Sequence, residues 1–116
     1  MKLPNIFEKT DNLQSYRAGD IILEEGARGD AMYVVKDGEI EIVAAGRVME
    51  TVGPEGFFGE MALVDSEPRS ASARAKTDCT LVPITERQFL FMVSETPFFA
   101  LNVMRGLAQR LRRKQS

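Results

Sequence analysis

The sequence predicts an antiparallel β-roll of the jelly-roll type (a double-stranded β-helix) with one short central helix and two helices near its C-terminal end. Two observations support this prediction. About seven short segments rich in β-branched and aromatic residues follow one another at regular spacing, separated by Gly, Asp and Pro. After residue 84 the pattern changes to apolar residues at helical spacing. Strands followed by helices are typical of a β domain with a helical appendage.

The strands expected in the first half are bounded by turn residues. Asp37-Gly38 is a strong hairpin signal, because both central residues of such a turn have positive φ. The next four residues alternate between charged and apolar side chains, which gives one wet and one apolar face. We expect strands over residues 13–17, 21–25, 31–36, 39–42 and 48–52, preceded by a short helix at 3–9.

The second half is expected to hold two more strands, at residues 70–76 and 80–84, and then two helices. Thr85 and Gln88 form a capping box, in which each side chain binds the other residue's backbone amide. Pro97 starts the last helix, since proline at the first helical position loses no hydrogen bond. We expect one domain over residues 1–116, with the β-roll at about 13–84 and the C-terminal helices at about 86–114.

Composition argues against several classes of function. The net charge of −2 lacks the basic character of nucleic-acid binders, so we expect no direct DNA binding. No apolar run approaches the ~20 residues of a membrane-spanning helix, and the N-terminus carries no secretory signal. We therefore expect a soluble, cytoplasmic protein without a membrane segment.

The chain has no histidine and a single cysteine, Cys79. This removes histidine metal clusters and the Ser-His and Cys-His nucleophile pairs. We expect no catalytic residues, no metal site and no catalytic cofactor, and we interpret the protein as a binder rather than an enzyme. A small β-roll enzyme acting on a phosphosugar is the alternative; it would need a carboxylate dyad, for which Glu60 and Glu67 are the nearest pair.

Residues 58–73 are the most informative segment. Gly59 and Glu60 are placed to open a short helix, and Arg69 opens a strand ten residues later. Free amides at a helix start favour an anion, and a guanidinium adds geometrically specific hydrogen bonds to phosphate oxygens. A carboxylate beside a phosphate is repulsive unless it has its own partner, and a ribose hydroxyl is such a partner. The pattern therefore indicates a phosphorylated sugar as ligand.

Two runs in this segment resemble the phosphate-binding cassette of cyclic nucleotide-binding domains. They are residues 58–63, Phe-Gly-Glu-Met-Ala-Leu, and residues 68–71, Pro-Arg-Ser-Ala. That family includes regulatory subunits of cAMP-dependent kinase, the bacterial catabolite activator and cyclic-nucleotide-gated channels. Residues 29–40 are similar to the family's central hairpin, and the resemblance covers roughly residues 13 to 114.

The resemblance implies roles for several residues. Gly59 lets the phosphate approach the backbone, Glu60 accepts a hydrogen bond from the ribose 2′-hydroxyl, and Arg69 pairs with the cyclic phosphate. Backbone amides at positions 70 and 71 complete the phosphate shell. The expected ligand-binding residues are Gly59, Glu60, Met61, Arg69, Ser70 and Ala71.

The resemblance also bears on the base. Family members with alanine at the position of Ser70 prefer cAMP, and members with threonine prefer cGMP. Serine has the hydroxyl without the methyl, and it also occurs in bacterial members that bind cAMP. We therefore expect cAMP rather than cGMP as ligand. The sequence does not identify the residue that covers the base; Arg112 and Arg113 are the candidates.

The last expected helix carries an apolar stripe spaced 3, 4 and 3 residues apart: Leu101, Met104, Ala108 and Leu111. Such spacing suits a coiled coil, but it extends over too few residues to decide between two interpretations. The stripe packs on the domain's own roll, or it forms a homodimer.

Our prediction is a regulatory sensor module that binds a cyclic nucleotide and signals by repositioning its C-terminal helices. Because the chain contains no effector, it would act on an unknown protein in trans. Two alternatives remain open at this point. The chain is an isolated sensor domain of a larger channel or regulator, or it is a ligand-free scaffold of the same fold that acts through protein contacts.

Overall fold

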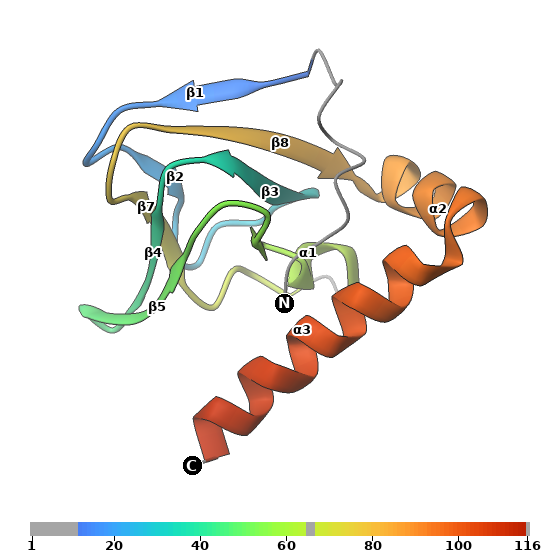
Figure 1. Ribbon diagram of the computed structural model, residues 1–116. Helices are drawn as coiled ribbons and strands as arrows, with labels where there is room; N and C mark the ends of the chain where they lie inside the picture. Colours follow the sequence, from blue (N-terminus) through green and yellow to red (C-terminus); the bar gives the residue numbers. More distant parts are fainter. Residues whose placement is uncertain (1–11, 65–66, 116) are drawn as a thin grey trace.

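The structure is a computed structural model that describes residues 12–64 and 67–115. Two four-stranded antiparallel sheets form a β-roll, which confirms the expected fold (Figure 1). The first sheet has the order β1 (Gln14–Tyr16), β8 (Cys79–Thr85), β3 (Ala31–Asp37), β6 (Phe57–Phe58). The second has the order β2 (Ile21–Leu23), β7 (Ser72–Ala75), β4 (Ile40–Ala44), β5 (Arg47–Val52).

Each expected strand is present, with ends that differ by up to two residues. The structure adds β6, which the sequence did not predict because it is a two-residue strand whose pairing partner, β3, lies more than twenty residues away. The helix expected at residues 3–9 lies outside the described residues. Among the residues that the structure describes, no helix is long and apolar enough to span a membrane.

The turn between β3 and β4 is built on a required glycine. Gly38 has φ +90°, and a Cβ there would lie 2.4 Å from the carbonyl oxygen of Asp78. Only glycine combines that conformation with so close a backbone neighbour. The expected turn is present, but the expected hairpin was wrong: β3 and β4 lie in different sheets and do not pair, and only Gly38 of the two residues has positive φ. The turn joins the first sheet to the second.

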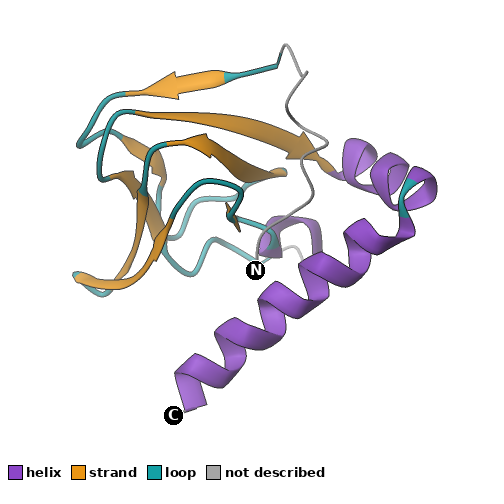
Figure 2. Cartoon of the chain, in the orientation of Figure 1, coloured by secondary structure: helices purple, strands orange, loops and turns teal. Residues whose placement is uncertain are grey.

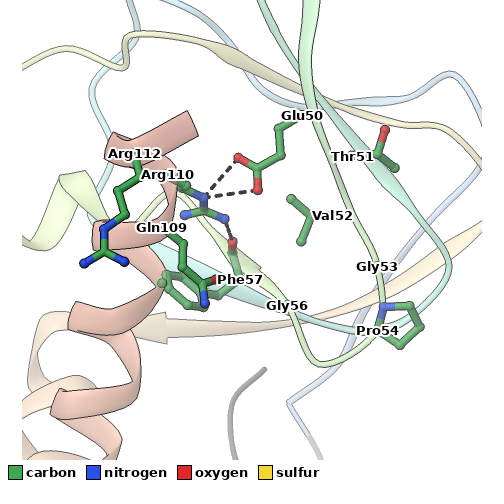
Figure 3. A pocket seen from close by; sticks show the side chains of 11 residues that line it. Glu50, Thr51, Val52, Gly53, Pro54, Gly56, Phe57, Gln109, Arg110 and Arg112 are labelled. Atoms are coloured by element: carbon green, nitrogen blue, oxygen red, sulfur yellow. Dashed lines mark hydrogen bonds and ion pairs between the residues drawn. The ribbon is translucent and has the colours of Figure 1, made fainter. Parts of the chain in front are cut away.

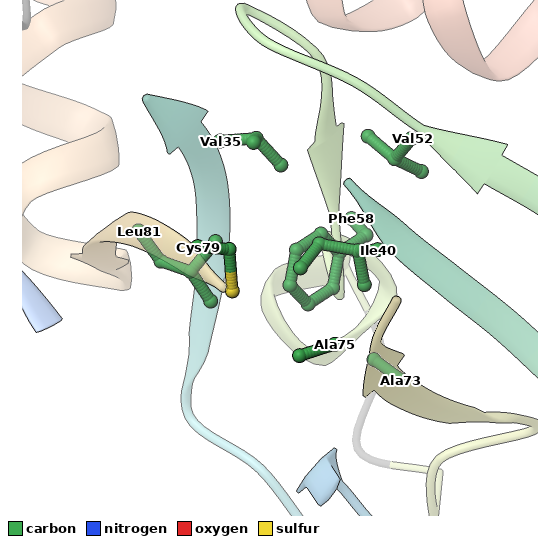
Figure 4. Close-up of a cluster of buried hydrophobic side chains, with 8 residues drawn as sticks. All are labelled: Val35, Ile40, Val52, Phe58, Ala73, Ala75, Cys79 and Leu81. Atoms are coloured by element: carbon green, nitrogen blue, oxygen red, sulfur yellow. The ribbon is translucent and has the colours of Figure 1, made fainter. Parts of the chain in front are cut away.

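The first sheet is shared between two hydrophobic clusters because side chains alternate across a strand. Val34 and Phe57 face the helices, whereas Val35 and Phe58 face the second sheet. Figure 4 shows the cluster between the sheets, which consists of Val35, Ile40, Val52, Phe58, Ala73, Ala75, Cys79 and Leu81. The cluster beneath the helices consists of Met32, Val34, Phe57, Val82, Ile84, Phe99 and Val103.

Three helices lie on one side of the roll (Figure 2): α1 (Met61–Val64), α2 (Glu86–Glu95) and α3 (Pro97–Gln115). The expected capping box starts α2. The Gln88 amide donates to the Thr85 hydroxyl at 3.3 Å, and the Thr85 amide donates to the Gln88 side chain at 2.9 Å. Phe99 is fully buried and makes an edge contact with Phe89, with 5.2 Å between ring centroids, so it anchors α3 at its first turn.

The face that α3 turns to the roll differs from the expected stripe. Its buried residues are Phe99, Val103 and Gly106. Leu101, Met104 and Leu111 are 37%, 58% and 60% exposed, and Ala108 is exposed as well. The interpretation that this stripe packs on the domain's own roll was therefore wrong, because those side chains lie on the outer faces of the helix.

Candidate functional site

Arg69 is held by two strand-like backbone contacts and points into the roll. Its amide donates to the Ala27 carbonyl at 2.8 Å, and its carbonyl accepts from the Gly26 amide at 2.8 Å. Its guanidinium donates to the carbonyl oxygens of Gly59 and Ala31, each at 3.0 Å. The cation thus lies against the backbone step where residues 59 and 60 lead into α1.

Two glycines make room for this guanidinium. A Cβ on Gly29 would lie 2.0 Å from the Arg69 Nη2 atom, which no real structure tolerates, and a Cβ on Gly59 would lie 3.0 Å from Nη1. Gly59 also has φ +78°, a conformation that favours glycine. Gly59 was expected in the site. Gly29 was noted only as part of the hairpin resemblance, since nothing local ties it to Arg69.

Glu60 is 6% exposed, so its carboxylate is buried. It directly follows Gly59, whose carbonyl oxygen accepts from Arg69. The helix expected after it is present, but α1 is one turn of four residues. So short a helix aligns few peptide dipoles, so the positive charge next to this step comes mainly from arginine side chains, Arg69 among them.

The remaining expected residues lie around this step. Met61 is 48% exposed at the start of α1. Ser70 is exposed and Ala71 half-buried, directly after Arg69. The structure thus brings Gly59, Glu60 and Arg69 together and places the other three next to them in the chain.

Arg110 on α3 is the residue that sequence reasoning missed. Its Nε donates to Glu50 at 3.0 and 3.2 Å, and its Nη2 donates to the Phe57 carbonyl (Figure 3). Its Nη1 donates to Glu60. The guanidinium also lies over the Phe57 ring, 4.8 Å from its centroid. The only signal in the sequence was an arginine within a basic helix end, a pattern that is typical of a solvated cluster.

These charges are largely removed from water. The exposed fractions of the side chains are 20% for Arg110, 19% for Glu50 and 8% for Glu60. Ionised groups at such depth are costly unless they are paired and hydrogen-bonded. One guanidinium therefore serves two carboxylates and connects α3 to β5 and to the residue before α1.

A cavity of about 720 Å³ lies between β5 and α3 (Figure 3). Its size is within the range of small-molecule sites. Glu50, Val52 and Phe57 line it from the roll, and Gln109, Arg110 and Arg112 line it from α3. Glu60 contacts this lining through Arg110. Of the two candidates for covering the base, Arg112 borders the cavity, and the Arg113 side chain lies outside the described part of the chain.

Two further observations concern chemistry elsewhere. Among the described residues, no group of three or more His, Cys, Asp and Glu side chains could hold a metal ion. Cys79 is buried, and this burial, followed by the charges of Asp20 and Asp78, raises the pKa of its thiol.

A β-roll in which one arginine lies against a glycine-glutamate step, while an arginine of a C-terminal helix pairs with that glutamate, defines a class of small-molecule-binding regulatory domain. Residues 13–96 match the family model described as "Cyclic nucleotide-binding domain". The chain belongs to the cyclic nucleotide-binding domain family.

Relatives of the chain come from several kinds of protein. It is 34% identical over 73% of its length to a cGMP-dependent protein kinase of Plasmodium berghei. Its fold is similar to the crystal structure of the Thermus thermophilus catabolite activator protein, with TM-score 0.80, 33% identity and 89% of this chain covered. It is also similar to cAMP-bound PfPKA-R (141-441), with TM-score 0.71, 26% identity and 96% covered.

The chain spans only part of each of these proteins. It covers 10% of the kinase, 51% of the catabolite activator and 43% of the PfPKA-R chain. The shared part is therefore the cyclic nucleotide-binding domain, whereas the activities of the whole relatives belong to those proteins.

Proposed function

We propose that this chain is a cyclic nucleotide sensor domain that binds cAMP in preference to cGMP. The observation that carries the proposal is the Arg69 guanidinium, which lies 3.0 Å from the Gly59 carbonyl and beside the buried Glu60. A cyclic phosphate would offer Arg69 anionic acceptors that are stronger than the two carbonyls it now binds. The ribose hydroxyl would donate to Glu60. Met61, Ser70 and Ala71 complete the proposed site.

Calorimetric titration of the nucleotide-free protein with cAMP and with cGMP tests this function. Arg69→Ala should weaken binding by at least about 30-fold, because losing a charged partner of a buried anion costs about 2–5 kcal/mol. Arg74→Ala is the matched control, since Arg74 forms an ion pair with Glu41 on the second sheet, away from the cavity. If the wild type binds neither nucleotide, the ligand-free scaffold becomes the better interpretation. Tighter binding of cGMP would overturn the base preference.

The proposed signal passes through α3. Arg110 joins this helix to Glu60, the residue assigned to the ribose, so a ligand on Glu60 acts on the same carboxylate that holds the helix. Ligand binding can shift the helix only if the ligand prefers one of its arrangements. The output would then be read by a protein effector in trans.

Two proposals concern assembly and context. The exposed stripe of Leu101, Met104 and Leu111 favours a homodimer through α3. The low coverage of the relatives favours a domain that serves a larger channel or regulator. A non-enzymatic role over residues 1–116, no direct DNA binding and a cytoplasmic location stay predictions of the sequence.

A further inference from the structure

Glu50 is a carboxylate at a position where a strand would ordinarily place an apolar residue. By alternation along β5 it shares a face with Val52, which is 4% exposed and belongs to the core between the sheets. The Glu50 side chain is 19% exposed and borders the cavity. A carboxylate there costs free energy that an apolar side chain would not, which points to a role other than stability.

The Glu50 carboxylate binds the same guanidinium as Glu60. Both of its oxygens accept from Arg110 Nε, at 3.0 and 3.2 Å, whereas Glu60 accepts from Nη1. Arg110 is therefore held from two sides, one of them the residue proposed to bind ribose. In this arrangement Glu50 ties α3 to β5 without the help of a ligand.

We propose that Glu50 is a built-in competitor of the cyclic nucleotide: it holds Arg110 and α3 against β5, and thereby lowers the affinity of the site for its anionic ligand. This inference rests on the proposed function and adds a regulatory residue to it. The ligand is an anion, so the negative charge of Glu50, which binds the same guanidinium as Glu60, opposes its approach. The positive charge of Arg110 is already offset by two carboxylates. Charges this far from water are poorly screened, so the effect on an anion is substantial.

Glu50→Gln tests the competition, with Glu41→Gln as a matched control. Both substitutions remove one negative charge and keep the shape of the side chain. Glu41 also accepts from an arginine at 3.0 Å, and its side chain is 20% exposed, but it lies on β4 outside the cavity lining. We expect Glu50→Gln to bind cAMP about fivefold more tightly than the wild type, at the low end of usual coupling between sites. Glu41→Gln should stay within about twofold.

A second measurement needs no ligand. Glu50→Gln should speed amide hydrogen exchange in the half of α3 that contains Arg110, because local opening of the helix becomes easier. Exchange in the same segment should be unchanged in Glu41→Gln.

The outcomes separate the inference from the function on which it rests. Equal or weaker cAMP binding by Glu50→Gln, or unchanged exchange in α3, would overturn the competition while the sensor function stands. If neither the wild type nor either variant binds cAMP or cGMP, the proposed function fails, and the competition fails with it.

Discussion

Arg110 and Glu60, fifty residues apart in the chain, form an ion pair that joins the C-terminal helix to the residue proposed to bind ribose. The pair is more than a surface contact, because the exposed fractions of the two side chains are 20% and 8%. It gives α3 a direct connection to the proposed ligand site. A change in the hydrogen bonds of Glu60 is therefore also a change in what holds the helix.

Removing the guanidinium should destabilise the protein. Arg110→Met leaves Glu50 and Glu60 without the cation that they share, and breaking a buried ion pair in this way costs about 3–5 kcal/mol. Urea unfolding measures the free energy of unfolding. Arg105→Met is the control, since Arg105 is exposed on the same helix. Equal stability of the two variants would show that the Arg110 pairs contribute little.

Gly29→Ala should weaken ligand binding while the fold persists. The new Cβ would lie 2.0 Å from Nη2 of Arg69, so the guanidinium must move away from the carbonyls of Gly59 and Ala31. Because the obstructing atoms belong to the end of a flexible side chain, we expect the free energy of unfolding to change by less than about 1 kcal/mol. Binding of cAMP should fall by about tenfold or more. Calorimetry measures the affinity and thermal unfolding measures the stability, so together they separate the two effects. Unchanged affinity would contradict the proposal that the position of Arg69 next to Gly29 matters for binding.

Charges placed on the stripe of α3 should prevent self-association. Met104 and Leu111 are 58% and 60% exposed, and Met104→Glu together with Leu111→Glu would bury two carboxylates in an interface formed by this stripe. Light scattering during size exclusion should show a dimer of the 12.9 kDa wild-type chain and a monomer of the variant. Leu90→Glu is the control, because Leu90 is 59% exposed on α2, outside the stripe. A monomeric wild type at high concentration would rule out the homodimer.

The thiol of Cys79 should be unreactive in the folded protein. Burial, then the nearby Asp20 and Asp78, raise its pKa above the ordinary 9.0, so the reactive thiolate is scarce at neutral pH. Alkylation by iodoacetamide, followed by mass spectrometry, should be at least about tenfold slower than in urea. Because the pKa is raised, the rate should still be rising with pH at 9.0, the ordinary pKa of a thiol, and should level off only at higher pH. Similar rates in the folded and unfolded protein at pH 8 would contradict this burial.

The parts of the structure that could be predicted were those that depend on residues close together in the sequence. The Thr85–Gln88 capping box and the Asp37-Gly38 turn each depend on residues within a few positions of one another. Short runs of β-branched and aromatic residues between turn residues predicted the individual strands for the same reason. The close placement of Gly59, Glu60 and Arg69 was also expected, but from the spacing of a familiar cassette.

Contacts between distant segments had no such signal. Gly29 leaves room for the guanidinium of Arg69, which is forty residues away in the sequence. Nothing near Gly29 in the sequence marks it as part of a site. The two-residue strand β6 exists only because β3 pairs with it.

The amino-acid sequence by itself determined the β-roll, the order of helices and of every strand but β6, and the family to which the chain belongs, because these follow from periodicity, turn chemistry and one short cassette. Only the tertiary structure decided that Arg110 and Glu50, rather than the terminal arginines alone, border the cavity between β5 and α3. The rotation of α3 is set by the burial of Phe99 and Val103 against the roll. That packing turns Arg110 inward and leaves Met104 and Leu111 facing outward. The apolar pattern along one helix does not determine this rotation.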